Sequence, residues 1–329
     1  MFLDKVKNYV KNPQVLKKSM FLRELFLKMK LPMDFPYILN IEPTNACNLN
    51  CMMCPREKSK RKVGFISIDL YKKIIDECAN HKKLFRLFLQ KDGEPLLHPD
   101  IVEMVRYAKE KKVAKHVSII TNGVALKEEL AEGLIKAGLD EIIFSIDTTD
   151  PQKYIKIKGK DHLEKVEKNI ENLIKIRSSL KAKNPYIHAR IINMNLSEEE
   201  LTSFRNRWAI ADDIDLIPFH TWHSAIEGEL TYKKNGKDIK RYPCSLLWYT
   251  GVINWDGEFS LCCIDYNSDG IVGDVNNQTV HEIWNGEEMR KIRKYHIDGE
   301  YDKIKICSKC EYWLIKEDIG DFLREKQIL

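Results

Sequence analysis

The feature that most constrains this chain is a set of three closely spaced cysteines, Cys47-x3-Cys51-x2-Cys54. Three thiolates on one short loop cannot complete the tetrahedral coordination of zinc by themselves. They can hold three corners of a cubane iron–sulfur cluster and leave the fourth iron open to another ligand. The fold must therefore present a loop whose three sulfur atoms face one point.

Length, charge and cysteine content indicate a globular chain from a reducing compartment. At 329 residues the chain is long enough for one large domain and a smaller one. Its nine cysteines come without a signal peptide, which favours metal ligation over disulfides. No apolar run approaches membrane-spanning length, and the net charge of +5 is mild. The basic run 56–62 is interpreted as a solvated loop or as a surface that attracts an anionic substrate. It lacks the interleaved aromatic residues that are typical of a surface on which nucleic-acid bases stack. We therefore expect a cytoplasmic metalloprotein with no membrane span and no nucleic-acid partner.

Segments typical of strands and helices alternate through the first two thirds of the chain. Strands are predicted at 37–42, 85–90, 117–121, 141–146, 186–192 and 213–218. Helices are predicted at 69–79, 100–111, 127–137 and 197–208, and further helical segments lie between the fourth and fifth strands as far as residue 175. Six such units imply parallel strands with right-handed crossovers, and they are too few for a closed eight-stranded barrel. The prediction is an α/β fold with a partial, laterally open (β/α)6 barrel. Its chemistry is expected at the carboxyl ends of the strands, where the cysteine loop begins.

The pattern changes after about residue 238. Predicted strands at 248–254 and 258–263 flank an Asp-Gly turn at 256–257, and a helix is predicted from about 279 to 295. We expect three regions, which are an N-terminal helical segment (1–36), the barrel (37–237) and a small hairpin-and-helix domain (238–329).

The cysteine loop resembles the signature of the radical S-adenosylmethionine (SAM) enzymes, and further motifs follow the next strands. Gly93-Glu94-Pro95 resembles the end of the family's glycine-glycine-glutamate-proline motif, although Asp92 stands where the first glycine is usual. The segments 118–123, 144–147 and 154–159 resemble later family motifs. The resemblance implies a 4Fe–4S cluster on the three cysteines and SAM bound to its open iron.

The same resemblance implies roles for individual residues. Glu94, beside Gly93, is expected to take the SAM amino group, and Asn122 to lie in the strand that closes around the nucleoside. Ser145 is expected to contact the ribose. Lys158 stands where the family often has an arginine for the SAM carboxylate, and lysine supplies the charge without a bidentate fork.

A second cysteine set occupies the C-terminal region. Cys244, Gly257, Cys262 and the pair Cys307-x2-Cys310 resemble the shortened SPASM region, called a Twitch domain, which binds one auxiliary 4Fe–4S cluster. The resemblance therefore implies two 4Fe–4S clusters in all. No cysteine follows Cys310, so a second auxiliary cluster is not expected. By ligand chemistry alone, four thiolates also suit structural zinc.

Two cysteines and a short aromatic segment remain. Cys78 lies on the apolar face of a predicted helix and is interpreted as a core residue. Cys263 follows Cys262 on a predicted strand and should face the opposite side, either as a buried thiol or as a hydrogen-atom donor to a substrate radical. His220, Trp222 and His223 follow the sixth strand and are candidates to line the open side of the barrel.

The resemblance implies hydrogen abstraction by a 5′-deoxyadenosyl radical. A closed auxiliary cluster that accepts an electron favours alcohol dehydrogenation, as in the 2-deoxy-scyllo-inosamine dehydrogenases that the chain resembles. Alternatives are an epimerase of the aminoglycoside type with Cys263 as donor, a peptide-modifying enzyme, or a non-enzymatic iron–sulfur electron-transfer protein. About 36 residues precede the first predicted strand, which favours a small sugar-like or cyclitol substrate over a leader peptide. Flavodoxin or ferredoxin is the expected type of reductant.

Overall fold

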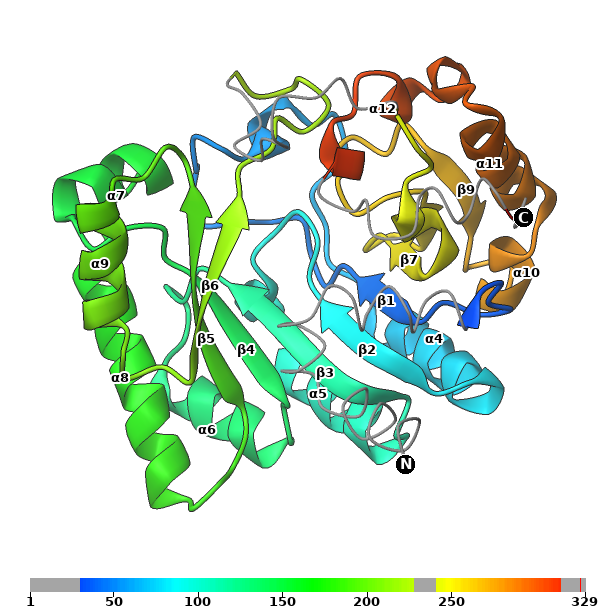
Figure 1. The fold of residues 1–329 in the computed structure, drawn as a ribbon. Coiled ribbons are helices and arrows are strands. Elements are labelled where there is room, and N and C mark those ends of the chain that lie inside the picture. Colours follow the sequence, from blue (N-terminus) through cyan, green and yellow to red (C-terminus); the bar gives the residue numbers. More distant parts are fainter. Residues whose placement is uncertain (1–29, 228–240, 315–325, 327–329) are drawn as a thin grey trace, which may run out of the picture.

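The core of the protein is one continuous mixed sheet. The computed structural model describes residues 30–227, 241–314 and 326. Nine strands pair in the order β6-β5-β4-β3-β2-β1-β7-β8-β9, and β1 to β6 are all parallel (Figure 1). These six strands span Ile38–Ile41, Leu84–Leu89, Ala114–Thr121, Glu141–Ser145, Tyr186–Asn193 and Asp213–Pro218. The α/β prediction of a partial, open barrel is confirmed, because β6 is an edge strand and the sheet does not close.

Helices follow the first five strands and cover the outer face of the sheet (Figure 1). Local signals explain where they begin and end. Ser67 caps α4 by accepting a hydrogen bond from Leu70 N, and Ser197 forms a capping box with Glu200 at the start of α9. Gly138 follows α6 with a φ of 84°, which suits glycine. The helices are α4 (Ile68–His81), α5 (Ile101–Glu110), α6 (Glu128–Lys136), α7 (Pro151–Lys158), α8 (Leu163–Ser179) and α9 (Glu198–Arg207).

The C-terminal part adds three strands to the same sheet. Strand β7 (Thr250–Ile253) pairs in parallel with β1, and β8 (Glu258–Ser260) and β9 (Ile271–Asp274) extend it in antiparallel fashion. The antiparallel pairing of β7 with β8 confirms the predicted hairpin, and Gly257 in its turn has a φ of 95°. The cysteine-bearing C-terminal part is therefore hydrogen-bonded directly to the first barrel strand.

Two predictions in this part need correction, and one strand is additional to those predicted. Strand β8 ends at Ser260 because the chain turns there, so Cys262 and Cys263 lie in a turn and not on a strand. The single helix predicted over 279–295 is two, α10 (Val280–Trp284) and α11 (Glu287–Asp298), separated at Asn285 and Gly286. Strand β9 was not predicted, because it is short and only partly buried.

Apolar side chains between the sheet and its helices form one extended core. Cys78 is fully buried in it, as predicted for the apolar face of α4. Nothing in the described ranges forms a helix long and apolar enough to cross a bilayer. The helical segment predicted within 1–36 falls mostly outside the described residues, as does the predicted boundary at 237–238.

Candidate functional site

The first three cysteines lie on a loop that leaves β1 at the carboxyl edge of the sheet. The loop is anchored at both ends of the cysteine set by backbone hydrogen bonds. Glu94 N donates to Ala46 O at 2.8 Å, and Met52 N donates to Ile157 O at 2.9 Å. Burial raises the pKa of all three thiols, that of Cys54 to about 12. A cationic metal centre would therefore have to displace their protons on binding.

Two glycines allow other segments to approach this loop closely. A Cβ on Gly93 would lie 2.2 Å from Thr44 O and 2.6 Å from Ala46 O. Gly159 has a φ of 76°, and a Cβ there would lie 2.9 Å from Asn50 O. No larger residue fits at Gly93 without movement of the cysteine loop, so this glycine has a packing reason of its own.

The Glu94 carboxylate is buried beside the loop and held by three hydrogen bonds. Thr121 Oγ1 donates to Oε1 at 2.6 Å, Leu96 N to Oε1 at 3.0 Å and Asn122 N to Oε2 at 2.7 Å. Burial raises the pKa of Glu94, and the hydrogen bonds oppose that rise. The Asn122 side chain donates to Asn48 Oδ1 at 2.8 Å, which places it against the cysteine loop.

Lys158 and Ser145 meet at one carboxylate. The Lys158 ammonium forms a buried ion pair with Asp147, and Ser145 Oγ donates to Asp147 Oδ2 at 3.2 Å. Burial alone would lower the pKa of Lys158, but the Asp147 carboxylate and the nearby Cys51 raise it above its ordinary value. Lys158 therefore carries its charge close to the cysteine loop.

An open, largely apolar pocket adjoins the loop on the side of β5 and β6. Its volume is about 480 Å³. The apolar part of its lining consists of Met52, Met53, Met194, Phe219 and Ile226. Cys54 also lines this pocket, so the pocket opens directly onto the first cysteine set.

The second cysteine set surrounds one small cavity in the C-terminal part. Cys244, Cys262, Cys307 and Cys310 all line it, and they come from three separate segments. Burial, and then the neighbouring Cys310, raise the pKa of the Cys307 thiol well above its ordinary value. Within the described ranges, no three Cys, His, Asp or Glu side chains converge tightly enough for a single metal ion. The two sets are all-thiol donor sets, which suit iron–sulfur clusters whose thiolates bind separate irons.

Cys263 lies on the same side as the second set, contrary to the prediction that it faces away from Cys262. Its thiol is hydrogen-bonded to that of Cys262, and this bond together with burial raises the pKa of Cys262. It also interacts electrostatically with Cys310 and Tyr312. The physical reason is the turn after β8, since strand alternation no longer sets the side-chain direction there.

The segment after β6 links the two cysteine loops. Trp222 Nε1 donates to Met53 O at 3.0 Å, and His223 Nε2 lies 2.9 Å from Ile264 O. His220 packs between Trp222 and Tyr312. Three consecutive residues, 222–224, have φ values of 51°, 58° and 67°, and such strained backbone persists only where surrounding contacts enforce it.

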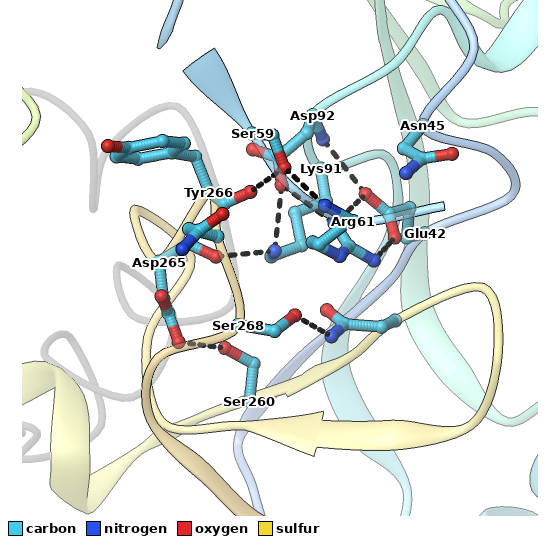
Figure 2. A network of polar contacts seen from close by, with 12 residues as sticks. Glu42, Asn45, Ser59, Arg61, Lys91, Asp92, Ser260, Asp265, Tyr266 and Ser268 are labelled. Atoms are coloured by element: carbon cyan, nitrogen blue, oxygen red, sulfur yellow. Dashed lines mark hydrogen bonds and ion pairs between the residues drawn. The ribbon is translucent and has the colours of Figure 1, made fainter. Parts of the chain in front are cut away.

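A buried charge network joins the barrel to the C-terminal part (Figure 2). Arg61 forms ion pairs with Glu42 at the end of β1 and, at 3.0 Å, with Asp92 before Gly93. Lys91 Nζ contacts Asp92 Oδ2 and donates to Asp265 O, both at 2.8 Å. Burial opposes ionisation of Glu42, yet Arg61 and Lys91 hold the pKa of Glu42 below its ordinary value.

This network corrects the interpretation of 56–62 as a solvated loop at one residue, Arg61, while four others in the run (57, 58, 60 and 62) are exposed as predicted. The Arg61 side chain is only 6% exposed. Ser59 Oγ donates to Tyr266 O at 3.0 Å, and Lys60 N donates to Asn267 Oδ1 at 2.8 Å, so the run packs on the C-terminal part. Arg61 is buried because folding brings Glu42 and Asp92, which are distant from it in sequence, next to its guanidinium.

Sequence reasoning missed two residues around the second set. Arg241 donates to Cys307 O and Ser308 O, and its guanidinium lies 4.1 Å from the ring centroid of Tyr301. His296 on α11 contacts both Cys244 and Cys307. No spacing or motif in the sequence marks either residue, since both reach the cysteines only through tertiary packing.

Comparison with known families assigns both regions. Residues 41–188 match the radical SAM superfamily, and residues 244–311 match the SPASM iron–sulfur cluster-binding domain. The matched domains imply 4Fe–4S clusters and SAM as cofactors.

Individual relatives agree at the level of the superfamily. The chain is 35% identical to a GTP 3′,8-cyclase of Chlorobaculum tepidum over 152 residues, covering 46% of this chain and 45% of the cyclase. It is 33% identical to a probable GTP 3′,8-cyclase of Methanococcus vannielii over 206 residues, covering 60% of this chain and 67% of the relative. The chain spans a little under half the length of the Chlorobaculum tepidum cyclase and of two other curated relatives that it matches.

A solved structure shares the fold. The crystal structure of BtrN in complex with AdoMet and 2-DOIA superposes with a TM-score of 0.58 at 18% identity, covering 84% of this chain and 93% of BtrN.

Replacing Arg61 with leucine tests the charge network. The change leaves two buried carboxylates with Lys91 as their remaining cation, and breaking a buried ion pair costs about 3–5 kcal/mol. We expect the free energy of unfolding of the apo chain, measured by urea titration, to fall by about that amount. Lys62→Leu, at an exposed position in the same run, is the control. Equal stability of the two variants would show that the network contributes little.

Proposed function

The chain belongs to the radical SAM superfamily, and from this premise we propose an oxidoreductase that dehydrogenates a small sugar-like or cyclitol substrate. When bound, SAM and the first cluster supply a 5′-deoxyadenosyl radical that abstracts hydrogen, and the auxiliary cluster supplies an electron acceptor. The residues of the chain have to hold these groups, orient the substrate between them and exclude water.

The observation that carries the proposal is the enclosed cavity lined by four cysteines. Four thiolates occupy all four corners of a cubane cluster, so no iron is left open for a substrate. A site closed in this way is suited to electron transfer and not to substrate ligation. Together with a three-cysteine site that leaves one corner open, it supports oxidation of the substrate.

The proposal assigns the binding of SAM to residues around the first cysteine set. In the proposal, Cys47, Cys51 and Cys54 hold the cluster, and Glu94 takes the amino group. The three hydrogen bonds to Glu94 leave part of its acceptor capacity for one further donor.

Lys158 is proposed to attract the SAM carboxylate, because an ammonium has three donors and Asp147 does not use them all. Ser145, beside the same carboxylate, is proposed to contact the ribose, and Asn122 the nucleoside. The pocket lined by Met53 and Phe219 is proposed to take the adenine ring, because its lining is largely apolar and it opens onto the first cysteine set.

A second candidate is an epimerase with Cys263 as hydrogen-atom donor. The observation that favours it is a thiol beside the auxiliary set that the cluster ligands do not require. We favour the dehydrogenase, because the contact with Cys262 gives Cys263 a structural explanation.

The names of the curated relatives suggest nucleotide cyclisation as a third outcome. Those relatives are called GTP 3′,8-cyclases, and the first of them aligns with this chain over less than half of its own length. GTP therefore belongs in every substrate assay as a competing probe. An external one-electron reductant of the flavodoxin or ferredoxin type completes the proposed reaction.

Iron content tests the assignment of the two cysteine sets. Anaerobically reconstituted protein should carry about eight irons, from two four-iron sites. The variant with Cys47, Cys51 and Cys54 replaced by alanine should keep about four irons. Iron and zinc are measured together by atomic emission. Stoichiometric zinc with a single four-iron centre would contradict the second site.

Glu94→Gln tests the amino-group site. Loss of a charge-assisted hydrogen bond of about 1.5–3 kcal/mol should weaken SAM binding about tenfold to a hundredfold. SAM affinity is measured by calorimetry on the reconstituted protein, with iron content determined on the same sample. Glu110→Gln, on the exposed part of α5, is the matched control. Unchanged affinity in the Glu94 variant would rule out the role.

The fate of the substrate radical separates dehydrogenase from epimerase. The probe is 2-deoxy-scyllo-inosamine in heavy water with SAM and dithionite, and GTP is tested in parallel. A carbonyl product without deuterium at carbon, formed equally by Cys263→Ala, supports dehydrogenation. Cys78→Ala controls for removal of a buried thiol. Deuterium on carbon that depends on Cys263 identifies the epimerase, and a cyclised GTP overturns both proposals.

A further inference from the structure

His296 bridges two of the four cysteines of the second set. It lies near the end of α11, is 1% exposed and lines the same cavity. Cys244 N donates to its Nδ1 at 3.2 Å, and its Nε2 lies 3.4 Å from Cys307 Sγ. The ring therefore has one nitrogen on each of two different cysteine-bearing segments.

The backbone contact fixes the tautomer of the ring. A backbone N–H can only donate, so Nδ1 must be the unprotonated nitrogen that accepts the hydrogen bond from Cys244. A neutral imidazole then carries its proton on Nε2, which points at sulfur. His296 is thus a donor to Cys307 Sγ and not a ligand that competes with it.

Neighbouring aromatic rings hold this orientation. The ring of His296 packs at a steep angle on Tyr301, at a centroid distance of 5.1 Å, and on Trp248 at 6.5 Å. Arg241 fixes the backbone of the Cys307 segment through its carbonyl groups. Both partners of the N–H···S contact are therefore held in place from separate elements.

We propose that His296 is a positioning residue that raises the reduction potential of the auxiliary cluster by donating its Nε2–H to Cys307 Sγ. Hydrogen bonds to cluster sulfurs stabilise the more negative, reduced state and so shift the potential upward. A higher potential makes the site a better electron acceptor, which is the role that dehydrogenation requires. This inference rests on the proposed assignment of the auxiliary cluster to these four cysteines.

The test uses the variant that lacks Cys47, Cys51 and Cys54, in which the auxiliary cluster is observed alone. Its midpoint potential is measured by redox titration followed by electron paramagnetic resonance. His296→Leu should make the potential more negative, because no donor faces Cys307. His296→Gln should restore a potential close to that of the parent, because the Gln amide also donates. His281→Leu, whose native ring stacks on His81, is the matched control.

Each outcome decides between the explanations. An unshifted potential in His296→Leu, or equal shifts in the Leu and Gln variants, overturns the donor role. If His296→Leu does not retain its cluster, the redox titration is replaced by pulsed electron paramagnetic resonance on the parent protein labelled with ¹⁵N-histidine. A weak histidine coupling that changes in His296→Gln supports the proposal, and no coupling, or a coupling strong enough for direct ligation, overturns it. Absence of any four-iron signal in the parent contradicts the cluster assignment instead.

Discussion

The arrangement of this protein depends on four buried charges, those of Glu42, Arg61, Lys91 and Asp92. Each carboxylate has lost its water and is stable only beside a cation, so the pairs must form together. The groups come from the end of β1, the loop after the three cysteines and the loop before Glu94. Their pairing therefore fixes the two loops that carry the first cysteine set and its neighbouring carboxylate.

The same network extends to the C-terminal part, so the two cysteine sets are held in one framework. Lys91 reaches Asp265, three residues after Cys262, and β7 pairs with β1 in the same sheet. The strained segment around Trp222 adds a third link between the cysteine loops. Three separate sets of contacts therefore join the parts of the chain that carry the two cysteine sets.

The residues that contact the second cysteine set bear on its function as much as the four cysteines do. Four cysteines would occupy every corner of a cubane cluster. His296 Nε2 contacts Cys307 Sγ, and the positively charged Arg241 side chain donates to Cys307 O. The hydrogen bond from Cys244 N occupies Nδ1 of His296, so a neutral ring carries its proton on Nε2, which faces Cys307 Sγ. A neutral donor next to a cluster thiolate adjusts the potential without becoming a competing ligand.

The sequence by itself determined the α/β alternation, the Asp-Gly turn at 256–257 and both cysteine sets. These features follow from local periodicity and spacing, which hold whatever the rest of the chain does. Only the tertiary structure decided that Arg61 is buried, that Cys263 turns toward Cys262, and that His296 faces Cys307. Those contacts join segments that are distant in sequence or that follow a turn, and neither periodicity nor spacing reports on how such segments meet.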